Sequence, residues 1–64
     1  MDVGRSLRAI QADRDVRNVD LQRAFKVGAP EVSRWRRMQD AKLSLVRKWA
    51  NYFGVTIDEF ITYQ

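Results

Sequence analysis

The only proline of this 64-residue chain, Pro30, constrains the fold more tightly than any other residue. Proline has no backbone N–H, and a helix tolerates its ring only in the first turn. A helix is therefore predicted to begin at about Ala29 and to extend to about residue 37. The preceding residues 26–28, which end in Gly28, are then left for a tight turn.

The predicted helix 29–37 has one apolar side and one cationic side. Val32 and Trp35 are three residues apart and share a face that can anchor the helix to a core. Ser33, Arg34 and Arg37 fall on the opposite side, where the long cationic side chains can reach a groove edge or a phosphate. A short cationic helix on an apolar seat has the form that reading the major groove of DNA requires.

Apolar residues recur at helical spacing elsewhere and predict four more helices, over residues 3–15, 18–25, 43–53 and 57–61. The residues expected to face the core from these helices are Val3, Leu7, Ile10, Leu21, Ala24, Phe25, Leu43, Val46, Trp49, Ala50, Phe53, Ile57, Phe60 and Ile61. No segment alternates apolar and polar residues with a period of two. The predicted fold class is therefore all-α, with five short helices.

Capping residues mark three of the predicted boundaries. Asp2 is a suitable N-cap for the first helix. Gly54 can adopt the left-handed conformation that ends a helix. Thr56 and Glu59 have the spacing of a capping box, which predicts the start of the last helix.

Cysteine and histidine are both absent. The chain therefore lacks thiolates, the commonest metal ligand and the commonest general base. Nothing pairs its carboxylates, such as Asp13, Asp15, Asp20 and Asp40, with a nucleophile or a pocket. We therefore expect no catalytic residue, metal site, cofactor or small-molecule ligand, and predict that the protein is not an enzyme.

The length predicts a single domain over residues 1–64. No apolar run approaches the ~18 residues of a membrane-spanning helix, and no signal-peptide pattern opens the chain. The expected location is the cytoplasm, near the nucleoid, without membrane association.

Positive charge is concentrated in the middle of the chain. Residues 17–48 carry nine Lys or Arg against three Asp or Glu, whereas residues 1–16 carry three of each. Residues 49–64 carry only Asp58 and Glu59. Clustering of cations around one turn and helix favours a polyanion as partner over an evenly solvated surface.

Two short helices joined by about three residues, the second apolar inside and cationic outside, fit the description of a helix-turn-helix. The order and spacing also resemble the Cro/CI-type (XRE-type) helix-turn-helix of phage and bacterial repressors. The matching pieces are Leu21, Phe25-Lys-Val27, Val32-Ser-Arg-Trp35 and residues 49–60. The resemblance implies a lambda-repressor-like domain with its helix-turn-helix at about residues 18–37. It also implies a transcriptional regulator, most simply a Cro-like repressor, that binds a palindromic double-stranded DNA operator as a homodimer.

Carried over to this sequence, the resemblance implies that four residues face the bases of the major groove: Ala29, Pro30, Ser33 and Arg34. Arg34 is expected to donate two hydrogen bonds to a guanine, worth about 1–3 kcal/mol of discrimination. Ala29 and Pro30 offer only apolar contact. Glu31 would repel a phosphate unless it accepts from a cytosine or pairs with Arg34 or Lys26. Its simpler role is that of an acid favoured by the helix dipole.

Five residues are expected to contact phosphates: Arg17, Asn18, Arg36, Arg37 and Lys42. Arg17 and Asn18 lie at the predicted start of helix 18–25, where free backbone N–H groups already favour an anion. The other three flank the reading helix and the connection that follows it. Such contacts position a protein on DNA without reading sequence, and make its binding depend on salt.

Aromatic and apolar residues in the last third of the chain are candidates for a dimer surface: Tyr52, Phe60, Ile61 and Tyr63. Phe60 and Ile61 could equally close the core. Trp35 and Trp49 lie on apolar stripes and are expected to pack inside the protein, although base stacking is the alternative.

Several residues depart from the pattern of the family. Arg17 replaces the usual Ser or Thr cap of the second helix, Asn18 replaces the usual glutamine, and Ala41 lies in a loop that often carries proline. Gln22 stands where the family usually has an alanine packed against the reading helix, and Lys26 stands where it usually has the turn glycine. The departures at Gln22 and Lys26 motivate the alternative function, a degenerate helix-turn-helix that acts as a protein-interaction module, like an antirepressor or antitoxin, with weak or no DNA binding.

Overall fold

The fold consists of five α-helices, with no strand, over residues 2–63, which are the residues that the computed structural model describes. The helices are α1 (Val3–Arg14), α2 (Asn18–Phe25), α3 (Ala29–Trp35), α4 (Leu43–Phe53) and α5 (Ile57–Ile61). The predicted all-α fold class is confirmed. The predicted bounds are confirmed for α2, α4 and α5, whereas α1 ends one residue early and α3 ends about two residues early.

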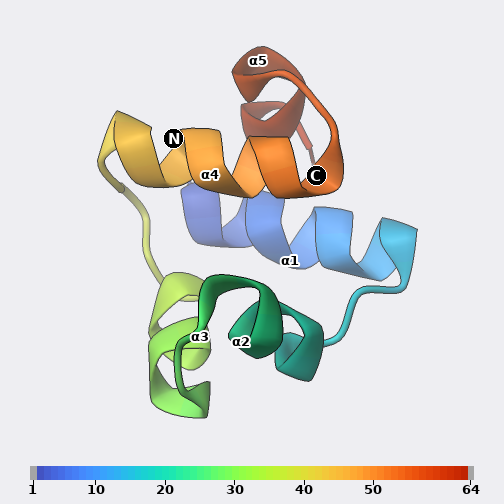
Figure 1. Cartoon of the computed structure of the whole chain (residues 1–64). Coiled ribbons are helices and arrows are strands. Elements are labelled where there is room, and N and C mark those ends of the chain that lie inside the picture. Colours follow the sequence, from blue (N-terminus) through green and yellow to red (C-terminus); the bar gives the residue numbers. More distant parts are fainter. Residues whose placement is uncertain (1, 64) are drawn as a thin grey trace.

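The helices form two groups on either side of one core. Helix α1 packs on α4 and α5, and α2 packs on α3. In Figure 1 the α2–α3 pair lies on one side of α1 and α4, and α5 lies on the other. The long segment between α3 and α4 connects the two groups. Because α2 and α3 are grouped apart from α5, the molecule presents two opposite ends.

The capping residues act as the sequence predicts. The Asp2 carboxylate accepts from the Arg5 N–H at 3.0 Å. Thr56 and Glu59 bond reciprocally, at 3.0 Å from the Glu59 N–H to the Thr56 hydroxyl and at 2.8 Å from the Thr56 N–H to the Glu59 carboxylate. Gly54 ends α4 with a φ of 72°. Local rules thus set the end of α4, the start of α5 and the start of α1.

A closed circuit of six aromatic side chains runs from the core to the surface at Tyr52. Going round it, each ring contacts the next, with centroid separations from 5.0 to 6.5 Å. The members of this aromatic circuit are, in order, Phe25, Trp35, Trp49, Phe60, Phe53 and Tyr52. They come from α2, α3, α4 and α5. Because aromatic pairs add about 0.5–1.5 kcal/mol beyond burial, the circuit binds these four helices into one unit.

Both tryptophans are buried, with Trp35 at 3% and Trp49 at 0% exposure. Their predicted place in the core is therefore confirmed, and neither has a face available for base stacking.

Helix α3 ends at Trp35 because the chain tightens there and turns toward α1. The Arg37 N–H bonds to the Arg34 carbonyl at 3.1 Å, and the Met38 N–H bonds to the Trp35 carbonyl at 3.2 Å. Such three-residue spacing tightens the end of a helix. The prediction that α3 extends to about residue 37 is therefore corrected.

Two residues expected in the core lie on the surface. Ala24 is exposed because the inner face of α2 is centred on Leu21 and Phe25. Leu43 is 59% exposed. It is the first residue of α4, and a helical side chain points toward the preceding turn, which does not exist there. Both expectations are corrected.

No helix among residues 2–63 has the length and apolar character needed to cross a membrane.

The start of α1 lies against the backbone that follows α3. The N–H groups of Val3 and Gly4 bond to the carbonyls of Gln39 and Met38, at 3.1 and 2.8 Å. These bonds satisfy donors that a helix start otherwise leaves free. A Cβ added to Gly4 would lie 2.7 Å from the carbonyl oxygens of both Arg36 and Met38. Position 4 is therefore restricted to glycine by close approach.

We expect Gly4→Ala to lower the free energy of unfolding by about 2 kcal/mol, because two backbone oxygens would have to move. The same change inside an ordinary helix stabilises by about 1 kcal/mol. Urea unfolding followed by tryptophan fluorescence measures the difference. Gly28→Ala is the matched control, since its added Cβ meets only Pro30 Cδ, at 3.5 Å. Stabilisation by Gly4→Ala would contradict the close approach.

Candidate nucleic-acid interface

Helix α3 is held by an apolar inner face and presents a mostly polar outer face. Val32 is fully buried, and Trp35 packs edge-on against Phe25, with an interplanar angle of 88°. The predicted anchoring of this helix by Val32 and Trp35 is therefore confirmed. The residues expected to face bases are all exposed: Ala29, Pro30, Ser33 and Arg34. Their exposure leaves them free to meet a ligand, while contact with bases remains a prediction.

Arg34 is engaged by Glu31 on the same exposed face. Arg34 Nε donates to Glu31 Oε1 at 3.1 Å, and Arg34 Nη2 donates to Glu31 Oε2 at 2.7 Å. This hydrogen bonding lowers the pKa of Glu31 and raises the pKa of Arg34. Of the roles considered for Glu31, pairing with Arg34 is confirmed. The guanidinium thus lies with its Nε and Nη2 edge along the Glu31 carboxylate.

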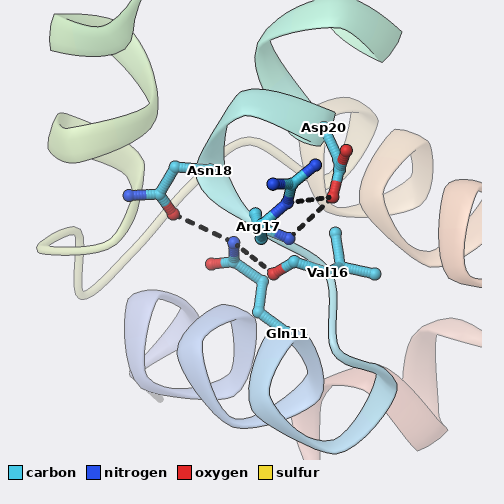
Figure 2. A network of polar contacts seen from close by, with 5 residues as sticks. All are labelled: Gln11, Val16, Arg17, Asn18 and Asp20. Carbon is cyan, nitrogen blue, oxygen red and sulfur yellow. Dashed lines mark hydrogen bonds and ion pairs between the residues drawn. The ribbon is translucent and has the colours of Figure 1, made fainter.

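The side chain of Gln11 joins α1 to the helix pair α2–α3. It is buried, at 3% exposure, and its Nε2 donates to the Val16 carbonyl at 3.2 Å and to Asn18 Oδ1 at 3.0 Å, as Figure 2 shows. Its Oε1 accepts from Arg36 Nη1. One buried amide therefore binds the link after α1, the first residue of α2 and the residue that follows α3.

Gln11 also fixes which end of the Asn18 amide faces outward. Asn18 Oδ1 accepts from Gln11, and in Figure 2 the Asn18 amide nitrogen points away from Gln11. Asn18 is exposed at the start of α2, where free backbone N–H groups favour an anion. An outward amide donor beside them suits a phosphate oxygen.

Arg17 lies next to Asn18 and is partly paired. The Arg17 backbone N–H donates to Asp20 Oδ2 at 2.9 Å, and Arg17 Nε lies 3.7 Å from the same oxygen. The Arg17 side chain is nevertheless 72% exposed. The Asp20 carboxylate thus caps the start of α2 and leaves most of the Arg17 guanidinium exposed to solvent.

The three cations expected to flank α3 differ in their surroundings. Arg36 is half-buried, and its bond to Gln11 gives it a partner inside the protein that the sequence did not suggest. One of its N–H groups is therefore used inside the protein, and contact of the others with a phosphate stays a prediction. Arg37 and Lys42 are exposed, and neither makes an ion pair within residues 2–63.

The departures from the family pattern at Gln22 and Lys26 are accommodated at the surface. Lys26 has a φ of 56°, so a lysine takes the left-handed position of the turn, and its side chain is exposed. Gln22 is half-buried, and its carbonyl accepts from the Val27 N–H at 3.0 Å. Helices α2 and α3 still pack on each other despite both residues.

The candidate dimer residues differ in their exposure to solvent. Phe60 is fully buried, because it belongs to the aromatic circuit, so the expectation that it forms part of a dimer surface is corrected. Ile61 and Tyr63 are half-buried, and the Tyr63 hydroxyl bonds to the Asp13 carboxylate. Tyr52 is 40% exposed while one side of its ring contacts Phe25.

No three acidic residues within residues 2–63 lie close enough to hold a metal ion. Comparisons with protein-family models, with curated proteins and with solved structures found no match for this chain.

We expect Gln11→Leu to lower the free energy of unfolding by about 2 kcal/mol, because Arg36 and the Val16 carbonyl would lose a buried partner. Thermal or urea unfolding measures this loss. Gln22→Leu is the matched control, since its half-buried side chain makes no hydrogen bond to the described residues and should change stability by less than about 0.5 kcal/mol. Equal effects of the two substitutions would show that the hydrogen bonds of Gln11 do not hold α1 to the helix pair α2–α3.

Proposed function

We propose that this protein is a sequence-specific double-stranded DNA-binding regulator of transcription, most simply a Cro-like repressor, that places α3 in the major groove. The observation that carries the proposal is the two-sided character of α3. Its inner side is fixed by Val32 and Trp35, and its outer side presents Ser33 and Arg34 to solvent. A groove about 12 Å wide admits one helix presented in this way.

Donors that precede and follow α3 in the sequence support contact with the DNA backbone. Asn18 and Arg17 lie at the start of α2, and Arg37 and Lys42 follow α3, so donors precede and follow the helix along the chain. The remaining N–H groups of Arg36 add to the donors that follow α3, together with Arg37 and Lys42. Phosphate contacts of this kind would fix the register of α3 in the groove.

The two ends of the molecule differ in charge, which favours one orientation toward a polyanion. Residues 17–37, which include α2 and α3, carry six Lys or Arg against Asp20 and Glu31. Helix α5 carries Asp58 and Glu59 and lies on the other side of α1 and α4, as Figure 1 shows. Such a charge distribution steers the basic end toward DNA.

We include a symmetric dimer on a palindromic operator in the proposal. Tyr52, Ile61 and Tyr63 retain exposed surface that a second copy could cover. A regulator of this kind would act at the nucleoid, in the cytoplasm.

A salt-titrated binding assay with duplex DNA tests the proposal. The logarithm of the binding constant should fall linearly with the logarithm of salt concentration, with a slope of about −0.9 for each phosphate contacted. Affinity weaker than about 10⁻⁴ M even at low salt would sink the DNA-binding proposal and favour the protein-interaction alternative.

Two substitutions separate base reading from backbone contact. Arg37→Ala should weaken binding to every duplex alike and reduce the salt slope by about 0.9. Arg34→Ala should instead cost about 1–3 kcal/mol of preference at one base position. Arg47→Ala on α4 is the control, because it removes an equal charge from a residue outside the proposed interface. Equal loss of preferred and random duplex binding in Arg34→Ala would exclude Arg34 as a base reader.

A further inference from the structure

The pair formed by Glu31 and Arg34 occupies one edge of the guanidinium and leaves another open. Nε and Nη2 both donate to the carboxylate, at 3.1 and 2.7 Å. A guanidinium carries five N–H groups in a fixed planar fork. The N–H groups of Nη1 and the second N–H of Nη2 therefore remain available at the far end of the plane.

The open end of the guanidinium has the geometry that guanine requires. Two parallel N–H groups on Nη1 and Nη2 match the O6 and N7 acceptors of guanine in the major groove. The carboxylate uses the side edge of the guanidinium, formed by Nε and Nη2, and a base would use the end edge, formed by Nη1 and Nη2. The two ligands therefore do not compete for the same hydrogens. A lysine could not do both, because it offers a point charge without a fork.

Both residues lie on the open side of α3, where the pair is accessible to a ligand. The side chains of Arg34 and Glu31 are 57% and 39% exposed. They are three residues apart on one helix, so the pair forms without help from another element. Because α3 packs against the core through Val32 and Trp35, this packing sets the position of the Glu31–Arg34 pair as a whole.

We propose that Glu31 is a positioning residue that determines specificity: it holds Arg34 by its side edge so that the end edge reads a guanine. This inference deepens the proposed DNA binding and rests on it. Holding the long side chain in one orientation reduces the conformational entropy that Arg34 loses when it meets the base.

The Glu31–Arg34 pair carries no net charge as a unit. It can therefore discriminate between bases while adding little to the general attraction of the protein to DNA, which other residues supply. The attraction to phosphates then comes from unpaired cations such as Arg37 and Lys42. Hydrogen bonding by Arg34 lowers the pKa of Glu31, so the carboxylate stays ionised at neutral pH. The hold on Arg34 is present above the ordinary pKa of a glutamate and is lost as the pH falls through the lowered value.

The experiment measures a ratio of affinities. A preferred duplex is first selected with the unaltered protein from a pool of random duplexes. Affinity is then measured for this duplex and for versions in which each G·C pair in turn is replaced by A·T. The discrimination ratio at the most sensitive pair is the readout, because any loss of an acidic residue raises affinity for all duplexes alike.

We expect Glu31→Gln to reduce this ratio about tenfold without weakening binding to random duplexes, since a bidentate contact discriminates by that order. In an Arg34→Ala background the same substitution should not change the discrimination ratio further, because Glu31 acts through Arg34. Asp40→Asn, which removes a similar charge from the exposed segment between α3 and α4, should leave the ratio unchanged.

Three results would overturn the inference. An unchanged ratio in Glu31→Gln would show that the carboxylate does not position Arg34. A raised ratio would show that Glu31 restrains Arg34 from the base. A full effect in the Arg34→Ala background would show that Glu31 acts by itself. Any of these leaves salt-dependent duplex binding intact, whereas failure of the unaltered protein to bind or select DNA removes the proposed function and this inference together.

Discussion

The packing of Trp35 between Phe25 and Trp49 is the interaction on which the rest of the structure depends. Its centroid lies 5.5 Å from each of the two neighbouring rings, which come from α2 and α4. Truncating a buried tryptophan costs about 3–5 kcal/mol, which is about the whole stability that one core gives a domain of this size. The same residue that holds the fold together therefore also fixes the orientation of α3. The packing that stabilises the fold therefore also determines which face of α3 is exposed to solvent.

The hydrogen bonds of Gln11 complement the aromatic circuit in holding the helices together. The aromatic circuit binds α2, α3, α4 and α5, and Gln11 binds α1 to the start of α2 and to Arg36 after α3. A buried amide is favourable only when its donors and acceptor are satisfied, and Gln11 has partners for both ends. The α2–α3 pair is thus held on its apolar side by rings and at its ends by hydrogen bonds. This attachment at several points suits the proposed contact of α3 with a DNA groove.

Local rules allowed much of the fold to be predicted, and tertiary contacts explain what was missed. Pro30, Gly54 and Thr56 act through neighbouring backbone, so the boundaries that they mark follow from sequence. Ala24 and Leu43 were misplaced because their exposure depends on which element covers a helix face. Gln11 lies four residues after Leu7, on the inner stripe of α1, and a polar residue there was a signal of a buried hydrogen-bonding site. Its bond to Arg36 spans 25 residues and could not be read from spacing.

For the candidate site, the outer face of α3 followed from helical spacing. The sequence left the pairing of Glu31 with Arg34 as one of several possible roles, and the structure selects it. The most direct measurement of the role of the outer face is a ¹H–¹⁵N NMR titration of the protein with duplex DNA at low salt. If α3 enters the major groove, amide shifts concentrate at the start of α2, on the exposed face of α3 and at Arg37, while Asp58 and Glu59 on α5 remain unchanged. Shifts centred on α5, or no shifts at all, would contradict this placement of α3.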